Sequence, residues 1–186
     1  MRKIASCILF LLFSVAAFAH CDGLDGPVVK AARAALAAKN ANLVLIWVQP
    51  SHETELREAF QSALKAAGST SEEAANHKFF ETAVRLHRAG EGAEFDGLKP
   101  AGNIPAPLVA ADRALELRSP DMLLEQINAD HREKVRQQFQ KVVSVADYRP
   151  DDVSAGREYV HQYVVLLHLV EHLTQEAAPA SAHDHQ

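Results

Sequence analysis

Apolar residues recur at helical spacing along most of the chain, and this pattern predicts a protein built from helices. The first periodic stretch covers residues 27–40 and opens with Pro27, a residue suited to the first turn of a helix. Two further stretches cover residues 51–66 and 71–88, each preceded or opened by residues that favour a helix start. Three amphipathic helices are therefore expected in the first half of the chain.

Two stretches break this pattern. The run Leu43–Val48 is apolar without a clear period, so a short buried helix and a β-strand are both open interpretations. Residues 90–107 are rich in Gly and Pro and have no period, which indicates a loop between two halves.

The pattern starts again after that loop. A shift of 79 residues aligns His52 with His131, and a shift of 81 aligns His87 with His168. The second half is expected to contain helices over 107–117, 130–146 and 152–174, with a short apolar turn at 122–124. Chance similarity between Ala-rich helices is the alternative explanation, but an internal duplication accounts for the whole order of elements.

These observations predict an all-α fold, a bundle of about six helices built from two pseudo-repeats. The repeats cover about residues 27–89 and 107–174 and are expected to pack about a pseudo-twofold axis. Together they form a single helical domain over residues 20–175, followed by a small, polar tail over 176–186.

The first 19 residues have the features of an export signal. Arg2 and Lys3 precede an apolar run over residues 4–18, and Ala17 and Ala19 are the small residues that a signal peptidase requires. The run is too short to be a membrane-spanning helix, so we expect no transmembrane segment in the mature chain. The mature protein is expected in the periplasm or outside the cell.

Composition limits the partners. Removing Arg2 and Lys3 with the signal leaves 17 basic and 24 acidic residues, a net charge of −7 without a basic cluster, which argues against nucleic acid. Cys7 leaves with the signal, so Cys21 is the single mature cysteine. In an oxidising compartment such a thiol forms a disulfide between chains, giving a homodimer, or reacts, or binds metal.

Cleavage after Ala19 would make His20 the first residue and place a free amine beside the His20 imidazole and the Cys21 thiol. Asp22 and Asp25 add two carboxylates close by. This donor set suits copper, nickel, zinc or iron without selecting among them. We call residues 20–26 the hook, since Gly23 and Gly26 allow it to fold back over a helix end.

Four further histidines are candidate metal ligands. His87 shares a helix face with apolar residues and should point inward, although a buried histidine is more often an ordinary hydrogen-bonded core residue. His161, His168 and His172 form one stripe on the last predicted helix, and both an interior and a solvent-facing placement are open. His52 and His131 are expected to be cap or surface residues.

Two resemblances accompany these patterns. Through its motifs at residues 20–29, 79–82, 85–92 and 156–160, the mature chain resembles a family of exported bacterial and archaeal helical proteins of unknown function. The start His20-Cys21-Asp22 also resembles the metal hook of nickel superoxide dismutase, a four-helix protein. Asp25 stands where that hook has its second cysteine, so the resemblance does not imply dismutase activity.

Two functions are consistent with the sequence. The first is an exported metal-binding protein whose site joins the hook to inward histidines and could support redox chemistry. The second is a non-catalytic helical interaction module in which Cys21 is a reactive or disulfide-forming thiol. Phosphate-binding loops, serine elbows and HExxH motifs are missing from the sequence, so it gives no support for common nucleotide or hydrolase chemistry.

Overall fold

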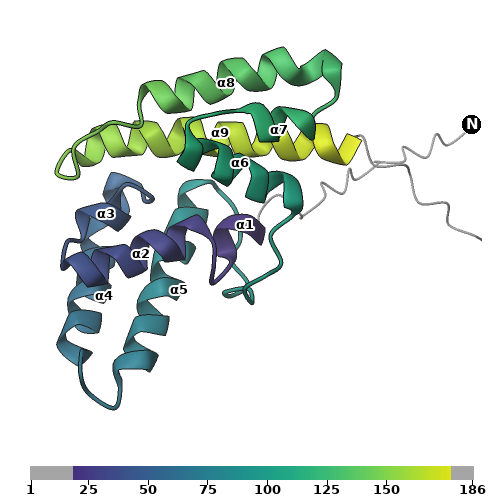
Figure 1. Ribbon diagram of the computed structural model, residues 1–186. Helices are drawn as coiled ribbons and strands as arrows, with labels where there is room; N and C mark the ends of the chain where they lie inside the picture. The colour runs from purple at the N-terminus through teal and green to yellow at the C-terminus, as the bar shows by residue number, and fades with distance from the viewer. Residues whose placement is uncertain (1–18, 177–186) are drawn as a thin grey trace, which may run out of the picture.

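The computed structural model describes residues 19–176 and is helical throughout, without a β-strand in that range (Figure 1). The predicted signal and tail therefore lie outside the described residues, apart from Ala19 and Glu176. The all-α prediction is confirmed, with six long helices and several single turns. The helices are α1 (Ala19–Asp22), α2 (Pro27–Ala38), α3 (Asn42–Leu45), α4 (Glu53–Ala66), α5 (Glu72–Gly90), α6 (Ala106–Leu117), α7 (Asp121–Glu125), α8 (Arg132–Ser144) and α9 (Val153–Glu176), with 3-10 turns η2 (Pro50–His52) and η3 (Ala129–His131).

The ambiguous apolar run forms a short helix and turns, not a strand. The α3 helix covers its first part, and the Asn40 side chain accepts a 3.0 Å hydrogen bond from the Asn42 backbone N–H just before it. All residues of 44–48 are buried, so the run is apolar on every side because it crosses the interior.

The second half repeats the order of elements of the first. The α2, η2 and α4 elements begin at Pro27, Pro50 and Glu53, and α6, η3 and α8 begin 79 residues later in each case. Lys39 and Arg118, also 79 residues apart, both follow a helix in the left-handed conformation, each with a φ of 52°. Packing repeats as well, since α4 lies along α5 and α8 lies along α9. The pseudo-twofold relation between the two units stays a prediction.

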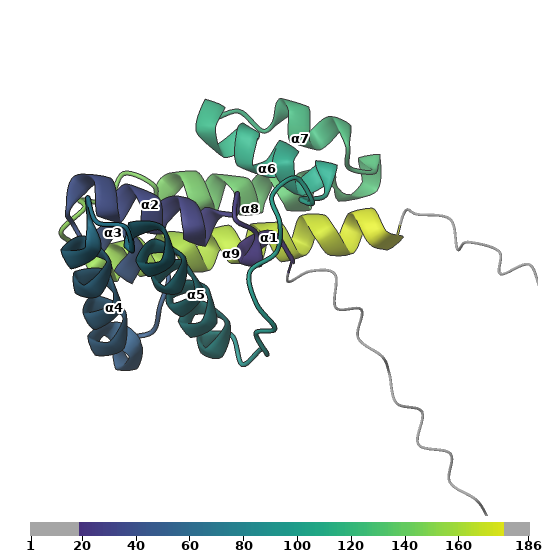
Figure 2. The same ribbon diagram turned by 90° about the horizontal axis from the view of Figure 1, so that it is seen from below.

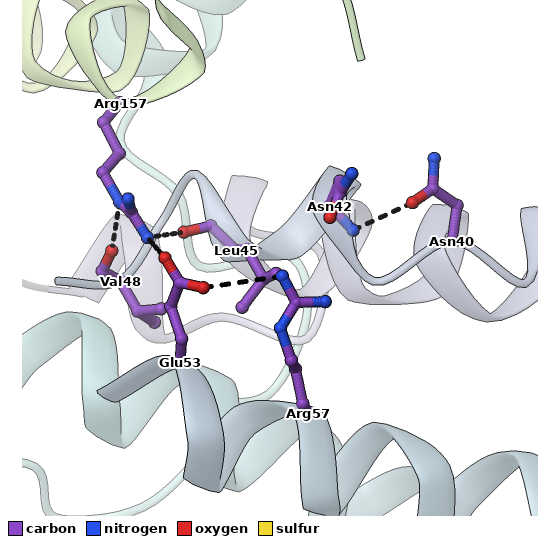
Figure 3. A network of polar contacts seen from close by, with 7 residues as sticks. All are labelled: Asn40, Asn42, Leu45, Val48, Glu53, Arg57 and Arg157. Atoms are coloured by element: carbon purple, nitrogen blue, oxygen red, sulfur yellow. Dashed lines mark hydrogen bonds and ion pairs between the residues drawn. The ribbon is translucent and has the colours of Figure 1, made fainter. Parts of the chain in front are cut away.

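The two halves meet where the start of α9 crosses the end of α3 (Figure 3). Arg157 donates hydrogen bonds from α9 to the backbone oxygens of Val48 at 2.8 Å and Leu45 at 3.4 Å, and to Glu53 Oε1 at 2.6 Å. The end of a helix leaves carbonyl groups without intrahelical partners, and Arg157 supplies donors for them. A Cβ on the neighbouring Gly156 would lie 2.3 Å from Ile46 Cγ2, so glycine permits this close approach.

Replacing Arg157 by Met should lower the free energy of unfolding by about 2–3 kcal/mol near neutral pH, because hydrogen bonds from a charged group are lost. The hydrogen bond from Arg157 is the main cause that lowers the pKa of Glu53 below its ordinary value of 4.5. That part of the stabilisation is complete above pH 4.5 and is lost as the pH falls through the lower folded-state pKa. The difference between the two proteins in urea denaturation should therefore shrink in acid.

The matched control is Arg136→Met, which removes an exposed ion pair to Glu133 within α8 and should change stability little. A stability loss for Arg157→Met that is the same in acid and at neutral pH would contradict the assigned role of Glu53.

Candidate functional site

The hook folds back over the start of α2, next to α9 and the loop that follows α5 (Figure 2). The Gly26 N–H donates to the Gly23 oxygen at 2.8 Å, and a Cβ on Gly26 would lie 2.2 Å from the His20 backbone oxygen. Only glycine allows so close an approach of two backbone segments. The loop is joined to the hook by two backbone hydrogen bonds, from Leu24 N to Lys99 O at 3.0 Å and from Lys99 N to Asp22 O at 2.9 Å.

His20 is almost fully buried, with 1% of its surface exposed, and has a defined orientation. Its Nε2 lies 3.1 Å from Asp112 Oδ2, and the other oxygen of Asp112 accepts a 2.7 Å hydrogen bond from the Tyr163 hydroxyl. Because an ionised carboxylate only accepts hydrogen bonds, Nε2 carries the proton of the neutral ring. The Nδ1 atom is then a bare lone pair, and it has no hydrogen-bond partner among the described residues.

Cys21 is a free, buried thiol. Burial raises its pKa far above the ordinary thiol value, and the carboxylates of Glu91 and Asp22 raise it further, while Arg88 acts in the opposite direction. The protonated form is therefore dominant, and the thiol is a poor nucleophile in this state. The same negative charges would favour a cation beside the sulfur.

Asp22 lies in a buried group of charges at the end of α5. Its Oδ1 is 3.5 Å from the Nε of Arg88, whose Nη1 donates to Glu91 Oε2 at 3.0 Å. Burial raises the pKa of Asp22 to about 6, against the favourable charge of Arg88. Asp25 points elsewhere, since its Oδ2 accepts a 2.7 Å hydrogen bond from the Gly102 N–H.

His87 is also buried, with 3% of its surface exposed. Its Nδ1 lies 2.9 Å from the backbone oxygen of Trp47, so Nδ1 carries the proton and Nε2 is the bare nitrogen of the neutral ring. The Nε2 atom faces Glu91 Oε1 at 3.4 Å. Burial lowers the pKa of His87, although the Glu91 carboxylate raises it, so the neutral ring is favoured.

The stripe of histidines on α9 faces solvent. His161, His168 and His172 are all exposed, because the inward side of α9 is filled by Tyr163, Leu166 and other apolar residues. His161 lines the same cleft as His87, and His168 lies close enough to contribute to the lowered pKa of His87. The expectation that His87 and His168 would both point into the interior therefore holds for His87 alone.

The predicted ligands are consequently spread over several places. Within residues 19–176 there is no group of three His, Cys, Asp or Glu side chains arranged to hold a metal ion. His20, Cys21 and Asp22 are neighbours in the hook, whereas the α9 stripe is separate from it. His52 and His131 precede α4 and α8 at equivalent positions, as cap residues would.

Several residues of this region were missed by the sequence analysis. Asp112 and Tyr163 orient His20 from helices far along the chain, and no spacing in the sequence predicts that contact. Glu91 had a usable signal, because it lies four residues after His87 on the same helix and so shares its face.

The sequence matches a family of unknown function, designated DUF6448, over residues 25–169. The chain belongs to this family. The match includes Asp25, His87, Asp112 and the histidines at 161 and 168, but it begins after His20, Cys21 and Asp22. Searches of curated proteins and of solved structures found no match. Among the described helices, none combines the length and the apolar character needed to cross a membrane.

Replacing Asp112 by Ala should lower the free energy of unfolding by about 1–3 kcal/mol, since buried polar groups of His20 and Tyr163 lose their partner. Tyr163→Phe should cost less, about 1 kcal/mol, because the contact between Asp112 and His20 remains. Arg113→Ala, an exposed change on the same helix, is the control for chemical denaturation. Equal stability of the Asp112 and Arg113 variants would show that the buried hydrogen bonds do not stabilise the hook.

Proposed function

We propose that this is an exported metal-binding protein whose metal site is built on the hook, with His20 Nδ1 and the Cys21 sulfur as its first ligands. The observation that carries the proposal is the buried, bare Nδ1 of His20, which the hydrogen bond to Asp112 orients. Histidines that bind metals commonly donate their other ring N–H to a carboxylate in this way.

Cleavage after Ala19 would complete the donor set. The new amine and Nδ1 belong to the same residue, and Nδ1 is the ring nitrogen nearer the main chain, so both can bind one ion in a small chelate ring. The hydrogen bond to Asp112 leaves free the nitrogen that such a chelate needs. Export itself is supported by the signal pattern of residues 1–19.

The charges around Cys21 support a cation at this place. Carboxylates raise the pKa of the thiol, which means that they disfavour a second negative charge there. A bound cation reverses this balance, because it stabilises the thiolate that coordinates it. Thiolate, imidazole and amine together suit copper, nickel, zinc or iron, and copper, nickel or iron would allow redox chemistry.

The alternative of an interaction module with a reactive or disulfide-forming Cys21 has less support. A thiol with 9% of its surface exposed and a raised pKa neither reaches a partner chain nor reacts readily in this conformation.

The test is the metal content and affinity of protein whose N-terminus is first established by sequencing. Protein that starts at His20 should bind about one nickel or copper ion per chain, and binding should fall in acid because the ligands must lose their protons. Adding one residue before His20 should weaken binding about tenfold or more, since the amine becomes an amide. Equal affinities of the native and extended forms would remove the amine from the proposed site.

Asp112→Asn is the sharper variant of the same test. An Asn amide can still accept from Tyr163, but it then presents its NH₂ group to His20 Nε2, which must become the acceptor and leave the proton on Nδ1. Metal affinity should fall about 10–100-fold while helicity is kept. Arg113→Gln on the same helix should change neither, and unchanged affinity in the Asn variant would contradict a role for Nδ1.

A further inference from the structure

A cleft of about 380 Å³ lies where the ends of α3 and α5 meet the start of α9. Apolar side chains and Trp47 form part of its wall, and its polar lining includes His87, Glu91 and His161. A cleft of this size with few convergent polar groups and a histidine of perturbed pKa is a good candidate for a binding site. The hook residues His20 and Cys21 do not line it.

Two acceptors face each other in this cleft. The proton of His87 is on Nδ1, which donates to the Trp47 backbone oxygen, so the bare Nε2 is directed at Glu91 Oε1 at 3.4 Å. The other carboxylate oxygen of Glu91 already accepts from Arg88 at 3.0 Å. A neutral imidazole nitrogen and a carboxylate oxygen so close together repel each other unless a positive charge lies between them.

A proton could supply that charge, but burial lowers the pKa of His87 and so disfavours the imidazolium ion. A metal ion fits the geometry better. Ligands at about 2.1 Å from a tetrahedral zinc ion lie about 3.4 Å from each other, and this matches the observed separation of Nε2 and Oε1. The hydrogen bond from Nδ1 to a backbone oxygen is also a common arrangement for a metal-binding histidine.

We propose that this cleft is a second metal site, which binds a divalent transition-metal ion such as Zn²⁺ through His87 Nε2 and Glu91 Oε1. His161, exposed on the α9 wall, becomes the third protein ligand when its side chain turns into the cleft, and water completes the coordination. The proposal does not depend on the hook, on cleavage of the signal or on Cys21.

Cobalt(II) is a suitable probe because its absorption differs between sites with and without thiolate. Trp47 is the only tryptophan of the chain and its ring lies 5.6 Å from that of His87, so quenching of its fluorescence by cobalt reports on the cleft. The experiment uses the Cys21→Ala protein, in which the hook lacks its thiol. This protein should bind cobalt without a thiolate-to-cobalt band, quench Trp47 and release cobalt when Zn²⁺ is added.

Adding His87→Gln or Glu91→Gln should weaken this binding about tenfold or more, and His161→Gln should weaken it less. His131→Gln, which changes a histidine outside the cleft, is the matched control, and circular dichroism checks that each variant is folded. Undiminished cobalt binding in both the His87 and Glu91 variants, or the lack of Trp47 quenching in the Cys21→Ala protein, would overturn the proposal. Failure of the hook site would be seen separately, as no thiolate band in the protein that retains Cys21.

Discussion

The contact of His20 with Asp112 and Tyr163 is the interaction on which the arrangement of the hook depends. It joins the start of the chain to two helices that follow about a hundred residues later, and it buries an imidazole that would otherwise lie in water. The Gly26 backbone makes the contact possible by letting the chain pass very close to the His20 carbonyl. With His20 fixed, Cys21 and Asp22 are carried into the interior beside Arg88, and this accounts for the raised pKa values of both groups.

Burial of ionisable groups is costly, and here it is concentrated in one region. The carboxylates of Asp22 and Glu91 share the Arg88 guanidinium, while His20 and His87 each use one ring nitrogen and leave the other bare. Unpartnered buried polar atoms are uncommon in folded proteins, and they gather at functional sites more often than elsewhere. The two histidines are oriented by different acceptors, a carboxylate for His20 and a backbone oxygen for His87, so the fold fixes opposite tautomers in them.

Much of the architecture could be predicted from the sequence, because helical periodicity and the stops at Gly and Pro are local signals. The order of elements in the two halves was visible in the matches His52 with His131 and His87 with His168. The run Leu43–Val48 could not be assigned, since a segment buried on all sides has no period. The partners of His20 could not be predicted either, because contacts with Asp112 and Tyr163 depend on how α6 and α9 pack. His168 was misleading for the same reason, since a position equivalent to that of His87 does not guarantee an equivalent burial.

Nitrogen-15 NMR of the histidine rings in metal-free protein tests the central claim most directly. Long-range proton–nitrogen correlations distinguish the two neutral tautomers and the imidazolium ion at each ring. At neutral pH we expect His20 to carry its proton on Nε2 and His87 to carry its proton on Nδ1, as their contacts with Asp112 and the Trp47 oxygen require. A proton on Nδ1 of His20, or imidazolium ions at both residues, would contradict the account, because no bare nitrogen would then be available to a metal.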